Sequence, residues 1–126
     1  MSYNLLIVDD SAIVRKVFQK TLALTGLTVG EVFEAANGQE ALDVLEKSWI
    51  DVIFLDINMP VMNGMEFMKH LRAKDEIKDI PVIVISTEGS KERKEELFNY
   101  NIRDYVRKPI SAERLSEVIS QILGGA

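Results

Sequence analysis

The sequence predicts an α/β fold in which five parallel strands alternate with five helices. Two observations support this prediction: short apolar runs recur along the chain, and segments with helical periodicity separate them. The clearest run, residues 52–56, delivers Asp56 to its end and is stopped by Pro60. A run that is apolar at almost every position is typical of a strand buried on both faces, as in a parallel sheet covered by helices.

The first half of the chain supplies three strands. Residues 5–8 form the first, and Ser11 is a suitable N-cap for the helix that follows. The inward face of this helix is expected to hold Val14, Val17, Phe18 and Leu22. Gly26 ends the helix, residues 29–36 give a shorter second strand, and an Asn-Gly turn starts a second helix. That helix is expected to bury Ala41, Leu42 and Leu45, before the third strand at 52–56.

The second half supplies two further strands. A helix spans residues 64–73, a polar loop follows, and the fourth strand at 81–86 opens with proline, where no ladder donor is lost. The helix is expected to bury Phe67, Met68 and Leu71. Residues 104–106 are the fifth strand. The final helix has the clearest apolar stripe, made by Leu115, Val118, Ile119, Ile122 and Leu123.

The fourth helix, residues 91–100, has the weakest pattern. It offers only Leu97, Phe98 and Tyr100 for burial, and its glutamates at 92 and 96 form a like-charge pair one turn apart. We therefore expect this helix to be weakly anchored and able to shift.

Composition bounds the function. A chain of 126 residues is one domain of ordinary size, and we expect residues 1–126 to be a single unit without an output domain. The net charge of -5 argues against a nucleic-acid surface. The absence of cysteine excludes disulfides and thiolate sites and fits a reducing cytoplasm. No segment is apolar enough to span a bilayer, and the N-terminus runs into a strand rather than a signal peptide.

Polar side chains gather at the expected ligand-binding edge of the sheet. In doubly wound folds ligands bind at the carboxyl ends of the strands. The residues predicted there are Asp9, Asp10, Asp56, Ser86 and Lys108. Three carboxylates at one edge repel one another, and such oxygen ligands suit Mg²⁺ or Mn²⁺. Asp10 by itself could equally be solvated or cap the next helix, but the three together favour a metal site.

These groups are the parts needed to accept a phosphoryl group. A carboxylate nucleophile, a cation and a hydroxyl suffice, because phosphoryl transfer is catalysed mainly by positioning and charge neutralisation. Lys108 could pair with Asp56 or with an incoming anion, although a lysine before a turn proline is also common on surfaces. Ser86 could donate to a phosphoryl oxygen or serve as a turn cap. The one histidine, His70, lies mid-helix and is expected to be exposed.

Taken together, these motifs resemble the receiver domains of bacterial two-component response regulators, and most closely the single-domain chemotaxis members. The resemblance covers essentially the whole chain and rests on the Asp9-Asp10 pair, Asp56 followed by Met-Pro and Gly64, the hydroxyl at Ser86, and Lys108 before proline. It implies a flavodoxin-like sheet of order 2-1-3-4-5 with helices on both faces. It also implies a phosphoacceptor that contributes to its own phosphorylation and dephosphorylation, rather than a separate turnover enzyme.

The resemblance also implies residue roles. Asp56 is the expected phosphoacceptor, and Asp9 and Asp10 hold magnesium with the backbone carbonyl of Asn58. Ser86 and Tyr105 are the expected switch residues: the hydroxyl moves to the phosphoryl group and the aromatic ring turns inward. Lys108 is expected to contact the phosphoryl oxygens, with a cis bond to the following proline.

The implied partners are a sensor histidine kinase as phosphodonor and a downstream protein, such as a flagellar motor switch protein or a phosphatase. Neither nucleic acid nor membrane is expected as a partner, and a monomer is expected. Asn58 and Glu88 match positions that tune aspartyl-phosphate lifetime, which predicts a short-lived phosphorylated state.

Two departures from the family pattern qualify the resemblance. Asn101-Ile102 replaces the small Gly-Ala turn of many relatives, and asparagine tolerates a left-handed conformation. Ile57 follows the phosphoacceptor where the best-known chemotaxis member has tryptophan. Trp49, the only tryptophan, is expected to lie too far from the site to report metal binding.

Three other functions fit parts of the pattern. A phosphatase of the haloacid dehalogenase type also uses an aspartyl nucleophile, but needs a second aspartate two residues later, where this chain has Asn58. A flavin module on the same topology would need a phosphate-cradling loop after the first strand, where Asp9 and Asp10 would repel an anion. A phosphorelay intermediate that passes the group to a histidine protein would use the same site as a chemotaxis regulator.

Overall fold

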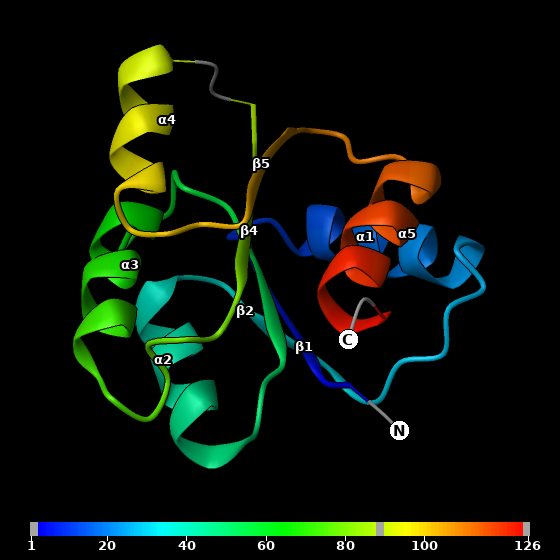
Figure 1. Ribbon diagram of the computed structural model, residues 1–126, viewed down its shortest axis with the longest axis horizontal. Helices are drawn as coiled ribbons and strands as arrows, with labels where there is room; N and C mark the ends of the chain where they lie inside the picture. Colours follow the sequence, from blue (N-terminus) through cyan, green and yellow to red (C-terminus); the bar gives the residue numbers. More distant parts are fainter. Residues whose placement is uncertain (1–2, 88–89, 125–126) are drawn as a thin grey trace.

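The computed structural model describes residues 3–87 and 90–124, and this part of the chain forms a five-stranded parallel sheet flanked by five α-helices (Figure 1). The strands are β1 (Leu5–Val8), β2 (Val32–Ala35), β3 (Val52–Leu55), β4 (Val82–Ser86) and β5 (Asp104–Arg107). The helices are α1 (Ala12–Leu24), α2 (Gly38–Lys47), α3 (Gly64–Ala73), α4 (Lys91–Phe98) and α5 (Ala112–Ile119), and a π-helical turn, η1 (Ser120–Gly124), continues α5.

The sheet has the order β2-β1-β3-β4-β5, as the family resemblance implied. Helices α1 and α5 cover one face, and α2, α3 and α4 cover the other (Figure 1). Because β1 pairs with both β2 and β3, the direction of winding reverses between β1 and β3. This reversal opens a crevice at the carboxyl ends of these two strands, which is where the sequence places its carboxylates.

Two hydrophobic clusters fill the spaces between the sheet and its helices. All residues of β1, β3 and β4 are buried, which confirms the prediction of strands covered on both faces. One cluster lies under α2 and α3 and includes Phe67 and Leu71; the other lies under α1 and α5 and includes Phe18 and Leu115. None of the described helices is both long and apolar enough to cross a membrane.

Several element boundaries and inward faces differ from the sequence prediction. Strand β2 spans only Val32–Ala35, and α4 ends at Phe98 rather than at residue 100. Val17 was expected inward but is 50% exposed, and Phe98 is 48% exposed. Both predictions were wrong because α1 and α4 lie on the sheet along narrower stripes than their apolar residues suggest. The side chain expected inward at Leu123 lies outside the described residues.

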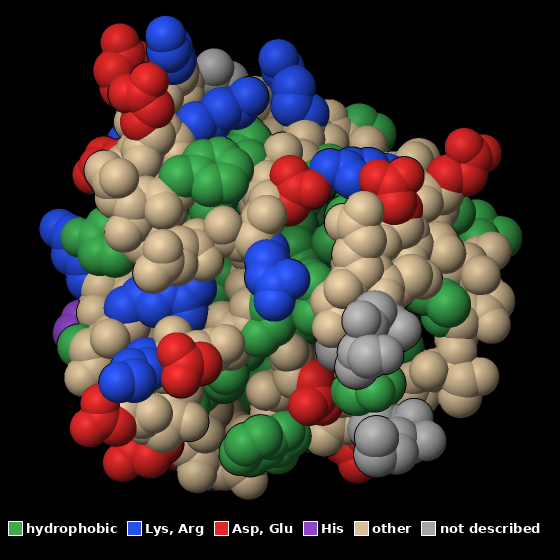
Figure 2. Space-filling view, viewed as in Figure 1, with side chains coloured by type: hydrophobic (Ala, Val, Ile, Leu, Met, Phe, Trp, Pro, Cys, Tyr) green, Lys and Arg blue, Asp and Glu red, His purple; other side chains and the backbone are tan. Residues whose placement is uncertain are grey.

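Surface charge is mixed. Acidic and basic side chains are interspersed over the face in Figure 2. Non-specific nucleic-acid binding depends on clustered Lys and Arg, so this face does not suggest such a partner.

Helix starts follow the sequence signals. Ser11 caps α1 by accepting from the Val14 N–H, and Asn63 forms a capping box with Glu66 at the start of α3. Gly64 follows that cap at a close approach: an added Cβ would lie 2.7 Å from the carbonyl oxygen of Asp56. Glycine therefore lets α3 begin directly against the end of β3.

We predict that Gly64→Ala lowers the free energy of unfolding by about 3 kcal/mol, because the methyl group would collide with backbone that cannot move aside easily. Gly26→Ala is the matched control: Gly26 has φ +71° and nothing within 4 Å of an added Cβ, so only conformational strain of about 1 kcal/mol is expected. Urea unfolding of both variants measures the difference, and equal losses would contradict the close-approach explanation.

Candidate functional site

Backbone hydrogen bonds align the candidate residues at the carboxyl edge of the sheet. The Asp9 N–H donates to β2 over 3.0 Å, and the Asp56 N–H donates to β1 over 2.9 Å. On the other side, the Lys108 N–H donates to the carbonyl of Ser86 over 3.0 Å. The ladder pattern thus continues one residue past β1, β3 and β5 and fixes where these side chains start.

The three predicted carboxylates lie together. Oxygen atoms of Asp9, Asp10 and Asp56 all fall within 4.8 Å of one another. Asp9 and Asp56 are only 4% and 7% exposed, whereas Asp10 is exposed. Two of the three charges are therefore removed from water at short range, which is costly unless a cation compensates them.

Lys108 supplies part of this compensation. Its Nζ lies 2.6 Å from Asp9 Oδ2 and 3.4 Å from Asp56 Oδ2. Of the two partners that the sequence left open for Lys108, Asp56 or an incoming anion, the structure shows Asp56, but Asp9 is closer. Burial alone would lower the pKa of Lys108; the hydrogen bond to Asp9 and the charge of Asp56 outweigh it, so this pKa is raised and the ammonium stays charged. The bond to Pro109 is cis, as the resemblance implied.

Asp56 is the most perturbed carboxyl group. Burial raises its pKa above the ordinary value of 3.8, and the nearby charge of Asp9 raises it further. Lys108 and the N–H of Ile57, which donates to Asp56 Oδ1 over 2.8 Å, act in the opposite direction without cancelling the rise. A nearby cation would therefore stabilise the ionised form of Asp56.

The residues present fit a divalent metal ion. Three carboxylates and one ammonium leave an excess of negative charge, and hard oxygen ligands suit Mg²⁺. Among the described residues, Asp9, Asp10 and Asp56 form the cluster of side chains able to hold a metal ion. Asn58, expected to contribute its carbonyl, follows Asp56 by two residues and is exposed.

The expected switch residues lie on the neighbouring strands. Ser86 ends β4 and is fully buried, and Tyr105 lies on β5, half-buried against the cluster under α2 and α3. No sequence motif indicates Lys94 of α4, whose Nζ lies 5.0 Å from the centre of the Tyr105 ring. The lifetime prediction for Glu88 falls outside the described residues.

An apolar groove of about 310 Å³ adjoins the acidic site between α1 and the segment after β5. Its lining runs from Asp56 and Lys108 down to Phe18. Thr87, which the sequence analysis did not single out, also lines it and is exposed, whereas the buried Ser86 does not. Thr87 directly follows Ser86 and also carries a hydroxyl. Because the end of a strand is predictable only to within a residue, Thr87 could have been considered beside Ser86.

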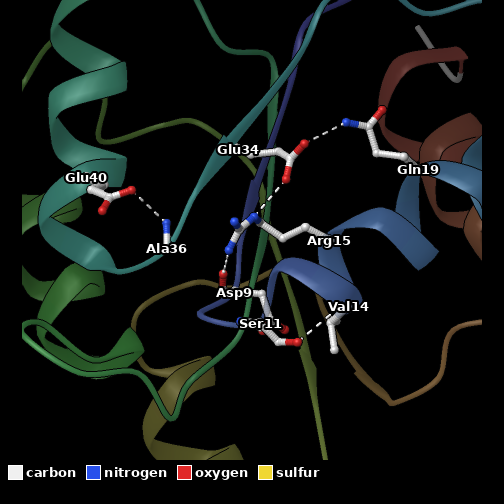
Figure 3. Close-up of polar contacts among 8 residues, drawn as sticks. All are labelled: Asp9, Ser11, Val14, Arg15, Gln19, Glu34, Ala36 and Glu40. Carbon is white, nitrogen blue, oxygen red and sulfur yellow. Dashed lines mark hydrogen bonds and ion pairs between the residues drawn. The ribbon is translucent and has the colours of Figure 1, made fainter.

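Arg15 is a second residue that the sequence analysis missed. Its Nη1 donates to the backbone carbonyl of Asp9 over 2.6 Å, and its Nε donates to Glu34 of β2 over 2.7 Å. Gln19 donates to the other carboxylate oxygen of Glu34 over 3.0 Å. Figure 3 shows Arg15 between Asp9 and Glu34. The only sequence signal was a basic residue one turn after the Ser11 cap.

The model of the response regulator receiver domain matches residues 5–120. The chain belongs to this family. A chemotaxis protein CheY homolog of Campylobacter jejuni is 38% identical over 122 residues, which cover 96% of this chain and 92% of the relative. The polar-differentiation response regulator DivK of Brucella anthropi is 33% identical over the full length of both chains. The crystal structure of the Vibrio cholerae chemotaxis protein CheY4 superposes with a TM-score of 0.85 at 36% identity, covering 98% of this receiver domain and 100% of that chain.

Membership in the family separates this receiver domain from the rival classes. Receiver domains are phosphoacceptor signalling proteins rather than turnover enzymes, so the phosphatase and the flavin module are set aside. His70 is exposed on α3, as predicted, and Trp49 is exposed in the segment before β3, at the opposite end of that strand from Asp56.

We predict that Asp56→Asn stabilises the metal-free protein at pH 7, raising the thermal midpoint by a few degrees. The raised pKa means that the folded state binds this proton more tightly than the unfolded state does. Ionisation of Asp56 therefore costs stability as the pH rises from about 3.8 through the folded-state pKa. The advantage of the variant should be full at neutral pH and disappear in acid.

Thermal unfolding with chelator between pH 3.5 and 7.5 measures this effect. Asp75→Asn is the control, because that carboxylate is 92% exposed and is expected to change little. A variant that is no more stable than the wild type at pH 7, or whose advantage is the same at all pH values, would contradict the desolvation of Asp56.

Proposed function

We propose that this receiver domain accepts a phosphoryl group from a phosphohistidine of a sensor histidine kinase onto Asp56. The observation that carries the proposal is the cluster of Asp9, Asp10 and Asp56 within 4.8 Å, with Lys108 bridging two of its members. Phosphoryl transfer needs a positioned nucleophile and neutralised charge, and this edge of the sheet offers both.

The proposed step needs no general base, because Asp56 ionises before it attacks. One of its oxygens forms a bond to phosphorus while the bond from phosphorus to the donor nitrogen breaks, and the imidazole nitrogen keeps the electron pair. The product is an aspartyl phosphate. Water attack on phosphorus later returns the Asp56 carboxylate and releases inorganic phosphate, which makes the signal self-terminating.

Two kinds of positive charge serve this step in the proposal. A divalent cation, when bound, neutralises negative charge on the phosphoryl and carboxylate oxygens; Asp9, Asp10, Asp56 and the backbone carbonyl of Asn58 would hold it. When the phosphoryl group is transferred, the Lys108 ammonium exchanges its hydrogen bond to Asp9 for one to a phosphoryl oxygen. The 2.6 Å contact with Asp9 keeps its ammonium within reach beforehand.

The signal is proposed to leave through Ser86, Tyr105 and α4. Within the described helix, Leu97 is the buried residue of α4, so few contacts oppose a shift of this helix. Its carboxyl end is better held: Arg72 of α3 donates to the carbonyls of Tyr100 and Asn101 in the turn that follows. A helix fixed at one end and loosely held along its length is suited to pivot when Ser86 is drawn to the phosphoryl group.

Two outputs are compatible with this switch. Relatives named as chemotaxis proteins, at 36–38% identity, support a role in chemotaxis, with a flagellar motor switch protein or a phosphatase as the partner. The similarity to DivK, which is named a polar-differentiation response regulator, supports a role outside chemotaxis. In this alternative we propose that the domain passes its phosphoryl group to a histidine phosphotransfer protein. Transfer of the phosphoryl group from the phosphorylated receiver domain to a histidine phosphotransfer protein would support the relay. Phosphorylation-dependent binding to a motor switch protein would support chemotaxis.

Intact mass spectrometry tests the proposal. Acid-quenched samples incubated with acetyl phosphate or phosphoramidate and Mg²⁺ should gain the mass of one phosphoryl group, and chelator should prevent the gain. Asp56→Asn should gain nothing, whereas the exposed-site control Asp75→Asn should behave like the wild type. An adduct that survives in Asp56→Asn, or no adduct from these donors and from a sensor histidine kinase, would overturn the assignment.

A further inference from the structure

The backbone between Asp9 and Asp10 is held by Arg15, a side chain outside the motifs on which the family resemblance rests. Asp9 and Asp10 are consecutive, so the peptide group that joins them sets the angle between their side chains. The carbonyl oxygen of this peptide accepts the 2.6 Å hydrogen bond from Arg15 Nη1. The Arg15 side chain is only 17% exposed, so water competes weakly for this bond.

The other bonds of Asp9 show what this contact adds. The Asp9 N–H donates to β2, its Oδ1 accepts from the Ser11 N–H over 2.9 Å, and its Oδ2 accepts from Lys108. These bonds fix the strand end and the carboxylate of Asp9. Within the described part of the chain, the Arg15 bond is the one that holds the carbonyl leading to Asp10. Among the described residues, the structure contains no hydrogen bond or ion pair to the Asp10 side chain, so its position depends on this peptide.

Glu34 neutralises the charge of Arg15, so Arg15 acts on the Asp9 carbonyl mainly by fixing its position. Its Oε1 lies 2.7 Å from Arg15 Nε, and a guanidinium beside a carboxylate carries little net charge at a distance. The planar fork of arginine donates to Glu34 with one nitrogen and to Asp9 with another, which ties α1 and β2 to the loop between β1 and α1 (Figure 3). A lone cation at this place would instead repel a divalent ion.

We propose that Arg15 is a positioning residue for the divalent cation, acting through the peptide group between Asp9 and Asp10. The proposal rests on the metal-dependent function proposed above. Arg15 does not contact the cation; paired with Glu34, it holds the exposed Asp10 carboxylate at the angle needed to share an ion with Asp9 and Asp56. Loss of partners that orient metal ligands weakens metal binding by about 10-fold to 100-fold in proteins.

Calorimetric titration of Arg15→Met with Mg²⁺ separates two explanations, positioning of Asp10 and the charge of Arg15, because they predict opposite changes in Mg²⁺ affinity. If Arg15 positions Asp10, the dissociation constant for Mg²⁺ rises by about 10-fold. If Arg15 acts only through its charge, removing a cation near the site makes Mg²⁺ bind more tightly. Lys16→Met is the matched control, because it removes the same charge from an exposed neighbour on α1 and should change the affinity only slightly.

Arg15→Lys and Gln19→Met complete the experiment. Lysine keeps the charge but lacks the fork, so we expect weaker Mg²⁺ binding than in the wild type. Gln19→Met removes the other partner of Glu34 and should leave the affinity unchanged. Thermal unfolding confirms that each variant is folded at the titration temperature; if Arg15→Met is not, Arg15→Lys provides the test.

Each outcome is decisive. Unchanged or tighter binding in folded Arg15 variants, with normal binding by the wild type, overturns the positioning role alone. A wild type that binds no Mg²⁺ overturns both this role and the metal-dependent function. Weaker binding in Arg15→Met and Arg15→Lys, with Lys16→Met and Gln19→Met near the wild type, supports it.

Discussion

Electrostatic repulsion among three carboxylates is the constraint on which the site depends. The apolar strands β1 and β3 run side by side and end together, so Asp9 and Asp56 are delivered to one edge with little water around them. Burial, and to a lesser extent the charge of Asp9, raise the pKa of Asp56, and Lys108, which directly follows β5, pairs with both carboxylates. One ammonium cannot neutralise three carboxylates. The metal-free fold thus keeps an excess of negative charge at this edge, which a bound cation can relieve.

The two sides of the sheet differ in a way that suits signalling. Around the acidic edge, β1, β2 and α1 are held together by backbone hydrogen bonds and by the Arg15–Glu34 pair, so the proposed metal ligands are held in place. On the side of β4 and β5, the proposed switch residue Tyr105 lies beside Lys94 of α4, a helix that buries Leu97 alone among its residues. A rigid site beside a loosely packed helix allows a local change of charge to alter a distant surface at small energetic cost.

The sequence was sufficient for the fold because hydrophobic pattern decides it. Short runs that are apolar at every position are typical of central strands of a parallel sheet, where both faces are buried. The Ser11 and Asn63 caps mark where α1 and α3 begin. Helix faces were less predictable: Val17 and Phe98 have apolar side chains in a plausible register but are half exposed. The rotation of a helix about its own axis relative to the sheet depends on the side chains of both elements. The apolar periodicity of the helix alone therefore does not predict it.

The site was predictable in its members and less so in its connections. Strand ends identified Asp9, Asp10, Asp56 and Lys108, because parallel strands end at a common edge. That Lys108 prefers Asp9 over Asp56 depends on side-chain distances that spacing does not give. Arg15 was missed for a similar reason: its partners are a backbone carbonyl and a glutamate on β2, which has no fixed sequence distance from α1.

The most direct test of this account is urea unfolding of the wild-type protein at pH 7 with increasing Mg²⁺. If the acidic edge is a cation site under electrostatic strain, the free energy of unfolding should rise with Mg²⁺, by about 2.7 kcal/mol at a concentration 100 times the dissociation constant. Sodium chloride at equal ionic strength should give much less, and Asp10→Asn should respond weakly to Mg²⁺. An unfolding midpoint that is the same with Mg²⁺ as with sodium chloride would contradict the account.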